Sequence, residues 1–184
     1  MGRCLLIAST GAPTPAFEAY EVPGVTLIPQ DMQMACWYAS AMMLLNWRER
    51  FRPGPMPISQ GIDALTLKLY KANDGIRNDQ ILPLAKRLGL VSVPPMSPTT
   101  EALKDWMRKF GPLWTNGKQH IVVIAGIRQA TSGSYEVKVY DPWPSTGITW
   151  RTLSGWYTGF NPDAHGVSSR DTDDAVEAVF LHAP

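Results

Sequence analysis

Apolar side chains recur with a helical period in the first 110 residues and with a period of two thereafter. The helical spacing, with capping residues and glycines at its boundaries, predicts helices over residues 33–50, 59–71, 78–88 and 97–110. Asp31 is a candidate cap for the first, and Pro83 is expected to delay or bend the third because it lacks a backbone donor. Beyond Gly111, alternation and short apolar runs predict strands over residues 112–115, 120–127, 135–140, 148–153 and 175–182.

The order of these elements, helices before strands, is typical of an α+β fold. A chain of 184 residues usually forms one domain. We therefore expect a single domain over residues 1–184, with an irregular segment at 1–29, a helical half at 30–110 and a sheet half at 111–184. Polar residues 158–174 are expected to form a loop.

Composition argues against several classes of partner and against a membrane-spanning or signal segment. The formal net charge is +1 and the basic residues are scattered, which argues against a nucleic-acid partner. No apolar run approaches the ~20 residues that span a bilayer, and the apolar stretch at residues 4–8 is shorter than the ~7–15 residues of a secretory signal. Two cysteines, Cys4 and Cys36, allow one disulfide but have no metal-binding spacing, so we expect no metal and no cofactor.

Cys36 lies in the first turn of the first predicted helix. The partial positive charge of a helix N-terminus favours thiolate over thiol, and the thiolate is the nucleophilic form. A lone cysteine on a helix is nevertheless more often a small core residue. Gln30, six residues upstream, strengthens the chemical interpretation. Its amide and the Cys36 backbone N–H are able to form an oxyanion hole, in which one donor stabilises the transition state by about 3–4 kcal/mol. The alternative is that Gln30 is an ordinary polar loop residue.

His120 opens one predicted strand and Asp141 closes the next, so the two residues meet if the strands form a hairpin. Directly opposite residues have Cβ atoms ~5 Å apart, within reach of a hydrogen bond. A slip of one residue moves Asp141 to the other face, and the pattern alone leaves the register open. The structural alternative is a buried histidine with no chemical role.

Three segments together resemble the papain superfamily of cysteine peptidases. Gln30 followed by Cys36–Trp37 at a helix start is similar to the oxyanion-hole glutamine and Cys-Trp signature of that superfamily. Residues Asp141–Trp143 resemble its Asn-Ser-Trp segment, with Asp in place of Asn as in bacterial branches. The resemblance covers about residues 28–45 and 111–150.

The resemblance implies a papain-like fold and a role for each matching residue. Cys36 would be the nucleophile, His120 its base, Asp141 the residue that orients the base, and Gln30 an oxyanion-hole donor. Trp37 and Trp143 would lie at the cleft, where Trp143 shields the Asp141–His120 hydrogen bond. The remaining candidates have structural interpretations: Ser40 lacks a glycine-rich elbow, and a solvated loop or isolated histidine accounts for Asp171, Asp173, Asp174, His165 and His182.

The function that follows is hydrolysis of amide bonds in a protein or peptide substrate. The same residues are able to deamidate or cross-link glutamine side chains or to act on peptidoglycan, which would make the protein an amidase, deamidase or transglutaminase-like toxin. A third alternative is an inactive peptidase fold used as a binding module. The intact set of four residues argues against it.

Trp37 favours the avirulence-type effector proteases of plant pathogens over the double-glycine leader peptidases, which usually carry Gly after the cysteine. Only 29 residues precede Gln30, too few for a helical prodomain. We therefore expect a bacterial effector or toxin, made in the cytoplasm without a cleavable signal and delivered by a specialised secretion system. A cognate inhibitor or immunity protein is a candidate partner.

Overall fold

The computed structural model describes residues 16–52, 62–93, 98–117, 120–153 and 179–184, and it confirms the α+β expectation. The helices within these ranges are α1 (Cys36–Phe51), α3 (Ala64–Lys71), α4 (Asn78–Arg87) and α5 (Thr100–Phe110). The strands are β1 (Tyr20–Glu21), β2 (Val91–Ser92), β3 (Leu113–Asn116), β4 (Ile121–Gln129), β5 (Tyr135–Asp141), β6 (Gly147–Thr152) and β7 (Phe180–His182).

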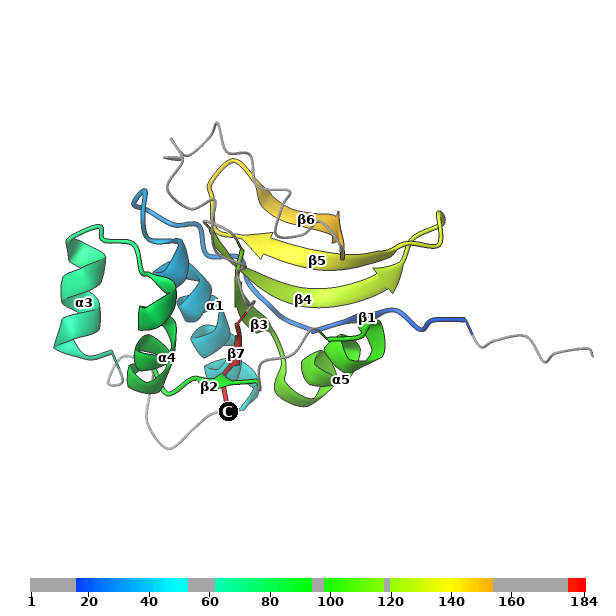
Figure 1. Cartoon of the computed structure of the whole chain (residues 1–184), viewed down its shortest axis with the longest axis horizontal. Helices are drawn as coiled ribbons and strands as arrows, with labels where there is room; N and C mark the ends of the chain where they lie inside the picture. Colours follow the sequence, from blue (N-terminus) through cyan, green and yellow to red (C-terminus); the bar gives the residue numbers. More distant parts are fainter. Residues whose placement is uncertain (1–15, 53–61, 94–97, 118–119, 154–178) are drawn as a thin grey trace, which may run out of the picture.

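All the described strands join one antiparallel sheet in the order β2-β7-β3-β4-β5-β6, and β1 pairs with β4. Figure 1 shows α1, α3 and α4 grouped at the end of the sheet that holds β2, β7 and β3, while β4, β5 and β6 extend away from them. The N-terminus of α1 thus lies beside the ends of the central strands.

The first helix forms the centre of the core. Its apolar residues at helical spacing bury Trp37, Leu44 and five other apolar side chains against β3 and β4. Two hydrogen bonds tie α1 to the sheet: the Trp114 indole N–H donates to the Trp37 carbonyl at 3.2 Å, and the Ser40 hydroxyl donates to the Ile121 carbonyl at 3.2 Å. These bonds set the position of the helix that begins with Cys36.

The change from helix to strand occurs at Gly111, as the sequence predicts. α5 begins after Thr99, whose hydroxyl accepts from the Ala102 N–H, and ends at Gly111 with φ of 87°. A Cβ at this position would lie 2.3 Å from the ring of Trp47. Only glycine meets both demands, the positive φ and the close approach of the indole.

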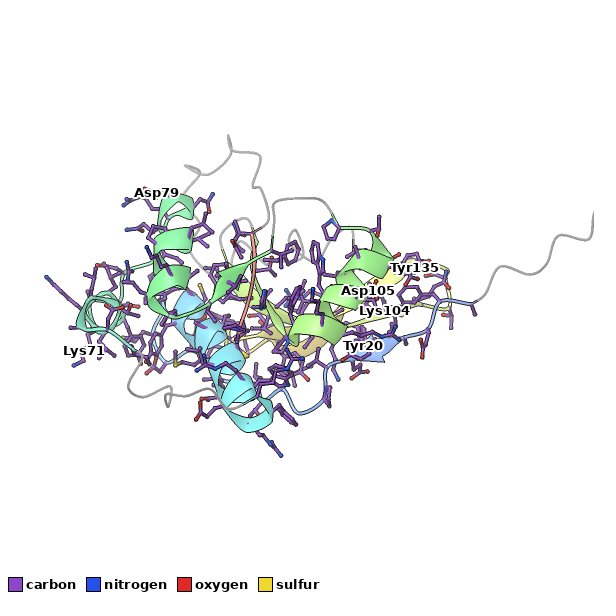
Figure 2. The ribbon with its side chains drawn as sticks, turned by 90° about the horizontal axis from the view of Figure 1, so that it is seen from below. Tyr20, Lys71, Asp79, Lys104, Asp105 and Tyr135 are labelled. Atoms are coloured by element: carbon purple, nitrogen blue, oxygen red, sulfur yellow. The ribbon has the colours of Figure 1, made fainter. Side chains whose placement is uncertain are left out.

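The N-terminal segment packs against α5. The Lys104 ammonium lies 4.4 Å from the centre of the Phe17 ring, and Arg108 pairs with Glu18 at 2.7 Å. Figure 2 shows Lys104 on α5 with Tyr20 of β1 near it. These contacts order residues that the sequence pattern assigns to an irregular segment, and β1 is a strand that the pattern does not predict.

Several predicted boundaries are wrong. α1 begins at Cys36 rather than at residue 33, and Asp31 does not cap it, because its carboxylate accepts from the Tyr70 hydroxyl instead. Pro83 lies inside α4 without delaying its start at Asn78. The short strand β2 is also absent from the prediction. Residues 59–61, the loop 158–174 and the strand residues 175–178 lie outside the described ranges.

Candidate active site

Cys36 is the first residue of α1, and it is a free, partly exposed cysteine. Two hydrogen bonds connect the segment around Cys36 to the turn after α3. The Asn73 side-chain oxygen accepts from the Met34 N–H at 2.9 Å, and the Asp74 carbonyl accepts from the Trp37 indole at 3.0 Å. The Tyr38 and Ala39 N–H groups both donate to the Ala35 carbonyl, at 3.1 and 3.0 Å. The Cys36 N–H comes before them at the helix start, where a backbone N–H has no acceptor one turn earlier, so it is the candidate donor to a substrate beside the thiol.

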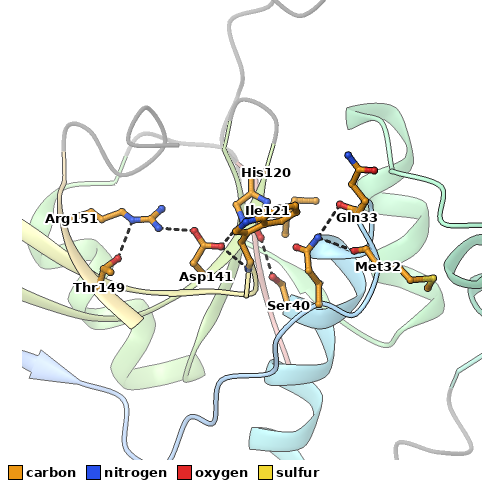
Figure 3. A network of polar contacts seen from close by, with 10 residues as sticks. Met32, Gln33, Ser40, His120, Ile121, Asp141, Thr149 and Arg151 are labelled. Carbon is orange, nitrogen blue, oxygen red and sulfur yellow. Dashed lines mark hydrogen bonds and ion pairs between the residues drawn. The ribbon is translucent and has the colours of Figure 1, made fainter. Parts of the chain in front are cut away.

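His120 and Asp141 meet at the end of the β4–β5 hairpin. Their atoms Nε2 and Oδ1 lie 2.6 Å apart, and both residues are buried (Figure 3). Near the site Val123 pairs with Tyr140, a register that places His120 and Asp141 on the same face of the sheet. A bulge between Ile124 and Ile127 shifts the pairing farther along the hairpin, and this irregularity is what the periodic pattern does not reveal.

Burial and hydrogen bonding oppose each other at both members of this pair. For Asp141, burial raises the pKa, but the bonds from His120, Arg151 and the Trp143 N–H outweigh it and leave the pKa below its usual range. For His120, burial lowers the pKa, whereas hydrogen bonds with Asp141 and Cys36 raise it to about 9. Cys36 is thus one of the groups that raise the His120 pKa, and a pKa of about 9 keeps the imidazole protonated at neutral pH.

Gln30 joins the cysteine loop to the end of β5. Its backbone N–H donates to the Pro142 carbonyl at 2.7 Å, so residues from the two halves of the chain converge here. The side-chain Nε2 donates to the carbonyls of Met32 and Gln33, each at 2.9 Å. The Oε1 atom is buried and lacks a hydrogen-bond partner within the described part of the chain. For Gln30 to donate to an oxyanion, one of the two N–H bonds must be exchanged for a bond to substrate.

The two tryptophans of the sequence motif occupy different surroundings. Trp37 is fully buried in the core below Cys36, away from open surface. Trp143 is half-buried, and its backbone N–H donates to Asp141 Oδ1 at 3.0 Å. Trp143 also lines an open cavity of about 340 Å³ between residues 30–33 and 143–145, directly beside Gln30.

Arg151 is a site residue that sequence reasoning missed. Its Nη2 lies 2.6 Å from Asp141 Oδ2, and its Nε donates to the Thr149 hydroxyl at 3.1 Å. In the predicted strand, the apolar residues Ile148 and Trp150 mark the opposite face as the buried one. The only signal available was a cationic residue in a short strand that pairs with the strand ending in Asp141.

The other candidates are one described histidine and several residues outside the described ranges. His182 is buried and its ring stacks on Phe110 with centroids 4.0 Å apart, in agreement with a structural role. Cys4, His165 and the acidic residues near 171 lie outside the described ranges. Among the described residues, there is no group of three His, Cys, Asp or Glu side chains placed to hold a metal ion, and no helix is long and apolar enough to cross a membrane.

A free cysteine at a helix start, facing a buried His–Asp pair at the end of an antiparallel hairpin, defines a papain-like cysteine protease. Comparison with known families agrees. A family model described as papain-like cysteine protease AvrRpt2 matches residues 16–157, and the chain belongs to this family. It is therefore a cysteine peptidase, a hydrolase.

Solved structures support the fold independently. The crystal structure of UfSP from C. elegans matches with a TM-score of 0.55 and 14% sequence identity, covering 93% of this chain. The match covers only 35% of that protein, so at this identity it shows a shared fold and nothing of substrate. No curated protein matches the sequence.

Proposed function

We propose that this protein hydrolyses amide bonds in protein substrates, with Cys36 as nucleophile, His120 as general base and acid, and Asp141 as the residue that orients His120. One observation supports it: the His120 ring and the buried Asp141 carboxylate lie 2.6 Å apart, and the hydrogen bond with Cys36 helps to raise the pKa of His120. Asp141 occupies one ring nitrogen, which leaves the other for the thiol.

The steps follow from these positions. The Cys36 thiolate attacks the carbonyl carbon, and the negative charge on its oxygen is stabilised by the Cys36 backbone N–H and by the Gln30 amide. As the tetrahedral intermediate collapses, the C–N bond breaks and His120 gives its proton to the leaving amine. Water then loses a proton to His120 and attacks the thioester, which releases the acid and restores the thiolate–imidazolium pair.

A test compares wild type, Cys36→Ala, and Cys4→Ala as the matched control on a quenched peptide library and on purified peptidoglycan. Wild type and Cys4→Ala should cleave peptides while Cys36→Ala does not. Brief iodoacetamide labelling at pH about 6 should modify Cys36 far faster than Cys4, because Cys36 lies at a helix start in the electropositive surroundings that make a cysteine reactive. Peptidoglycan cleavage without peptide cleavage would favour the amidase alternative. Equal labelling of both cysteines would refute Cys36 as the nucleophile.

We also propose that the protein is a bacterial effector or toxin that acts outside the cell in which it is made, with delivery by a specialised secretion system. The AvrRpt2 description of its family and the Cys36–Trp37 pair support this. Wild type expressed in the bacterial cytosol, in the periplasm or in a eukaryotic host should be more toxic than Cys36→Ala in at least one compartment. Equal growth of both strains in every compartment would exclude the effector role.

A further inference from the structure

We propose that Arg151 is a positioning residue that balances the charge of Asp141 and so limits how strongly Asp141 holds the proton on His120. The inference rests on the proposed roles of His120 and Asp141. It adds a fourth side chain to the site, one that touches neither the substrate nor the reacting atoms.

The two carboxylate oxygens of Asp141 have separate partners. Oδ1 accepts from His120 at 2.6 Å and from the Trp143 N–H at 3.0 Å, while Oδ2 accepts from Arg151 at 2.6 Å (Figure 3). The Asp141 side chain is 3% exposed and that of Arg151 is 14% exposed. Thr149 accepts from the Arg151 Nε at 3.1 Å and holds the guanidinium on this line. The carboxylate therefore lies directly between a permanent cation and the base.

The charges around Asp141 come from three elements. His120 precedes β4, Arg151 belongs to β6, and Cys36 at the start of α1 faces Asp141 through the imidazole. In a buried site a charge at this distance is only weakly screened. Arg151 thus withdraws part of the attraction that Asp141 exerts on the imidazolium. Arg151 also disfavours a neutral residue in place of Asp141, because an Asn at position 141 would leave a largely buried guanidinium without its carboxylate.

Loss of the guanidinium should increase the proton affinity of His120 rather than release Asp141. The carboxylate keeps both bonds to Oδ1, and water enters the partly exposed space that Arg151 vacates to solvate Oδ2. An imidazolium that holds its proton more tightly still supports the thiolate, but it donates less readily to a leaving amine. Arg151 therefore matters most for substrates whose leaving group needs a proton.

The experiment is an NMR titration of the His120 ring in the intact protein, assigned by comparison with His120→Gln. Arg151→Met should raise the pKa of His120 by about half a unit or more, while Arg151→Lys, which keeps the charge, should leave it near wild type. If Arg151→Met does not fold, Arg151→Gln replaces it, since its amide is uncharged yet still able to donate to Oδ2. A His120 pKa that is unchanged or lower in the uncharged variant overturns the proposal.

A kinetic readout separates this inference from the peptidase assignment. Arg151→Met should slow hydrolysis of a peptide amide more than hydrolysis of the matching p-nitrophenyl ester, whose leaving group needs no proton. Equal slowing of both substrates would also contradict the proposal. If the protein cleaves no peptide, the proposed function is refuted. The titration requires no turnover, so it would still measure the effect of Arg151 on the pKa of His120.

Discussion

The hydrogen bond between Ser40 and Ile121 offers the sharpest stability prediction, because the neighbouring segment after β5 offers no backbone donor in its place. The His120 carbonyl accepts from the Gly117 N–H, on the side of β3, so the next carbonyl, that of Ile121, points the other way, toward β5. Continuing the Val123–Tyr140 pairing two residues toward the site places residue 142 opposite Ile121. Residue 142 is proline and has no N–H to donate.

Ser40 supplies the missing donor from α1, and its side chain is fully buried. Ser40→Ala would leave the Ile121 carbonyl buried and unsatisfied, which costs about 1–3 kcal/mol. Alanine is the better helix former and recovers up to about 0.5 kcal/mol. We expect a net loss of about 1–2 kcal/mol, or roughly 2–8 °C in Tm for a domain of this size. Since Ser40 lies one turn after Cys36 and Ile121 follows His120, the same bond also fixes the separation of those two residues.

Urea unfolding followed by tryptophan fluorescence measures this loss, and the slope m should stay at its wild-type value. Ser92→Ala is the matched control, because Ser92 lies exposed on β2, and it should change the free energy of unfolding by less than about 0.5 kcal/mol. If Ser40→Ala behaves like that control, the Ile121 carbonyl finds another donor and the reasoning from Pro142 fails.

Two further predictions concern the site. Gln30→Ala should lower turnover ~10²–10³-fold while leaving the rate of Cys36 alkylation nearly unchanged, because the amide acts on the transition state. Gln33→Ala, at an exposed neighbouring residue, is the control. If Gln30→Ala leaves turnover unchanged, Gln30 is an ordinary loop residue. The raised pKa of His120, about 9 against 6.5, means that the folded protein binds this proton more tightly than the unfolded chain. Its contribution, on the order of 3 kcal/mol and shared with Asp141 and Cys36, is fully present below pH 6.5 and is lost as the pH rises through about 9. Urea midpoints measured across that window should fall for wild type and fall less for His120→Gln; parallel curves would contradict the shift.

The sequence by itself determined the elements that depend on neighbouring residues. The helical spacing after Cys36, the alternation of residues 135–140 and the glycine at position 111 are local features, and the structure has each element close to where the pattern predicts it. The order of helices and strands, and hence the α+β class, follows from the same periodicity. Cys36 at a helix start is likewise a local feature, although the start lies three residues later than predicted.

Only the tertiary structure decided which side chains meet. The β4–β5 register with its bulge brings Asp141 to His120, and a slip of one residue, which the pattern permits, would have separated them. The sequence also does not predict that two backbone carbonyls accept from the Gln30 amide, or that Arg151 contacts Asp141. A polar residue in a loop or short strand carries no periodic signal. Periodicity specifies the face on which a residue lies, whereas hydrogen-bond partners depend on registers and approaches between segments that are distant in the chain.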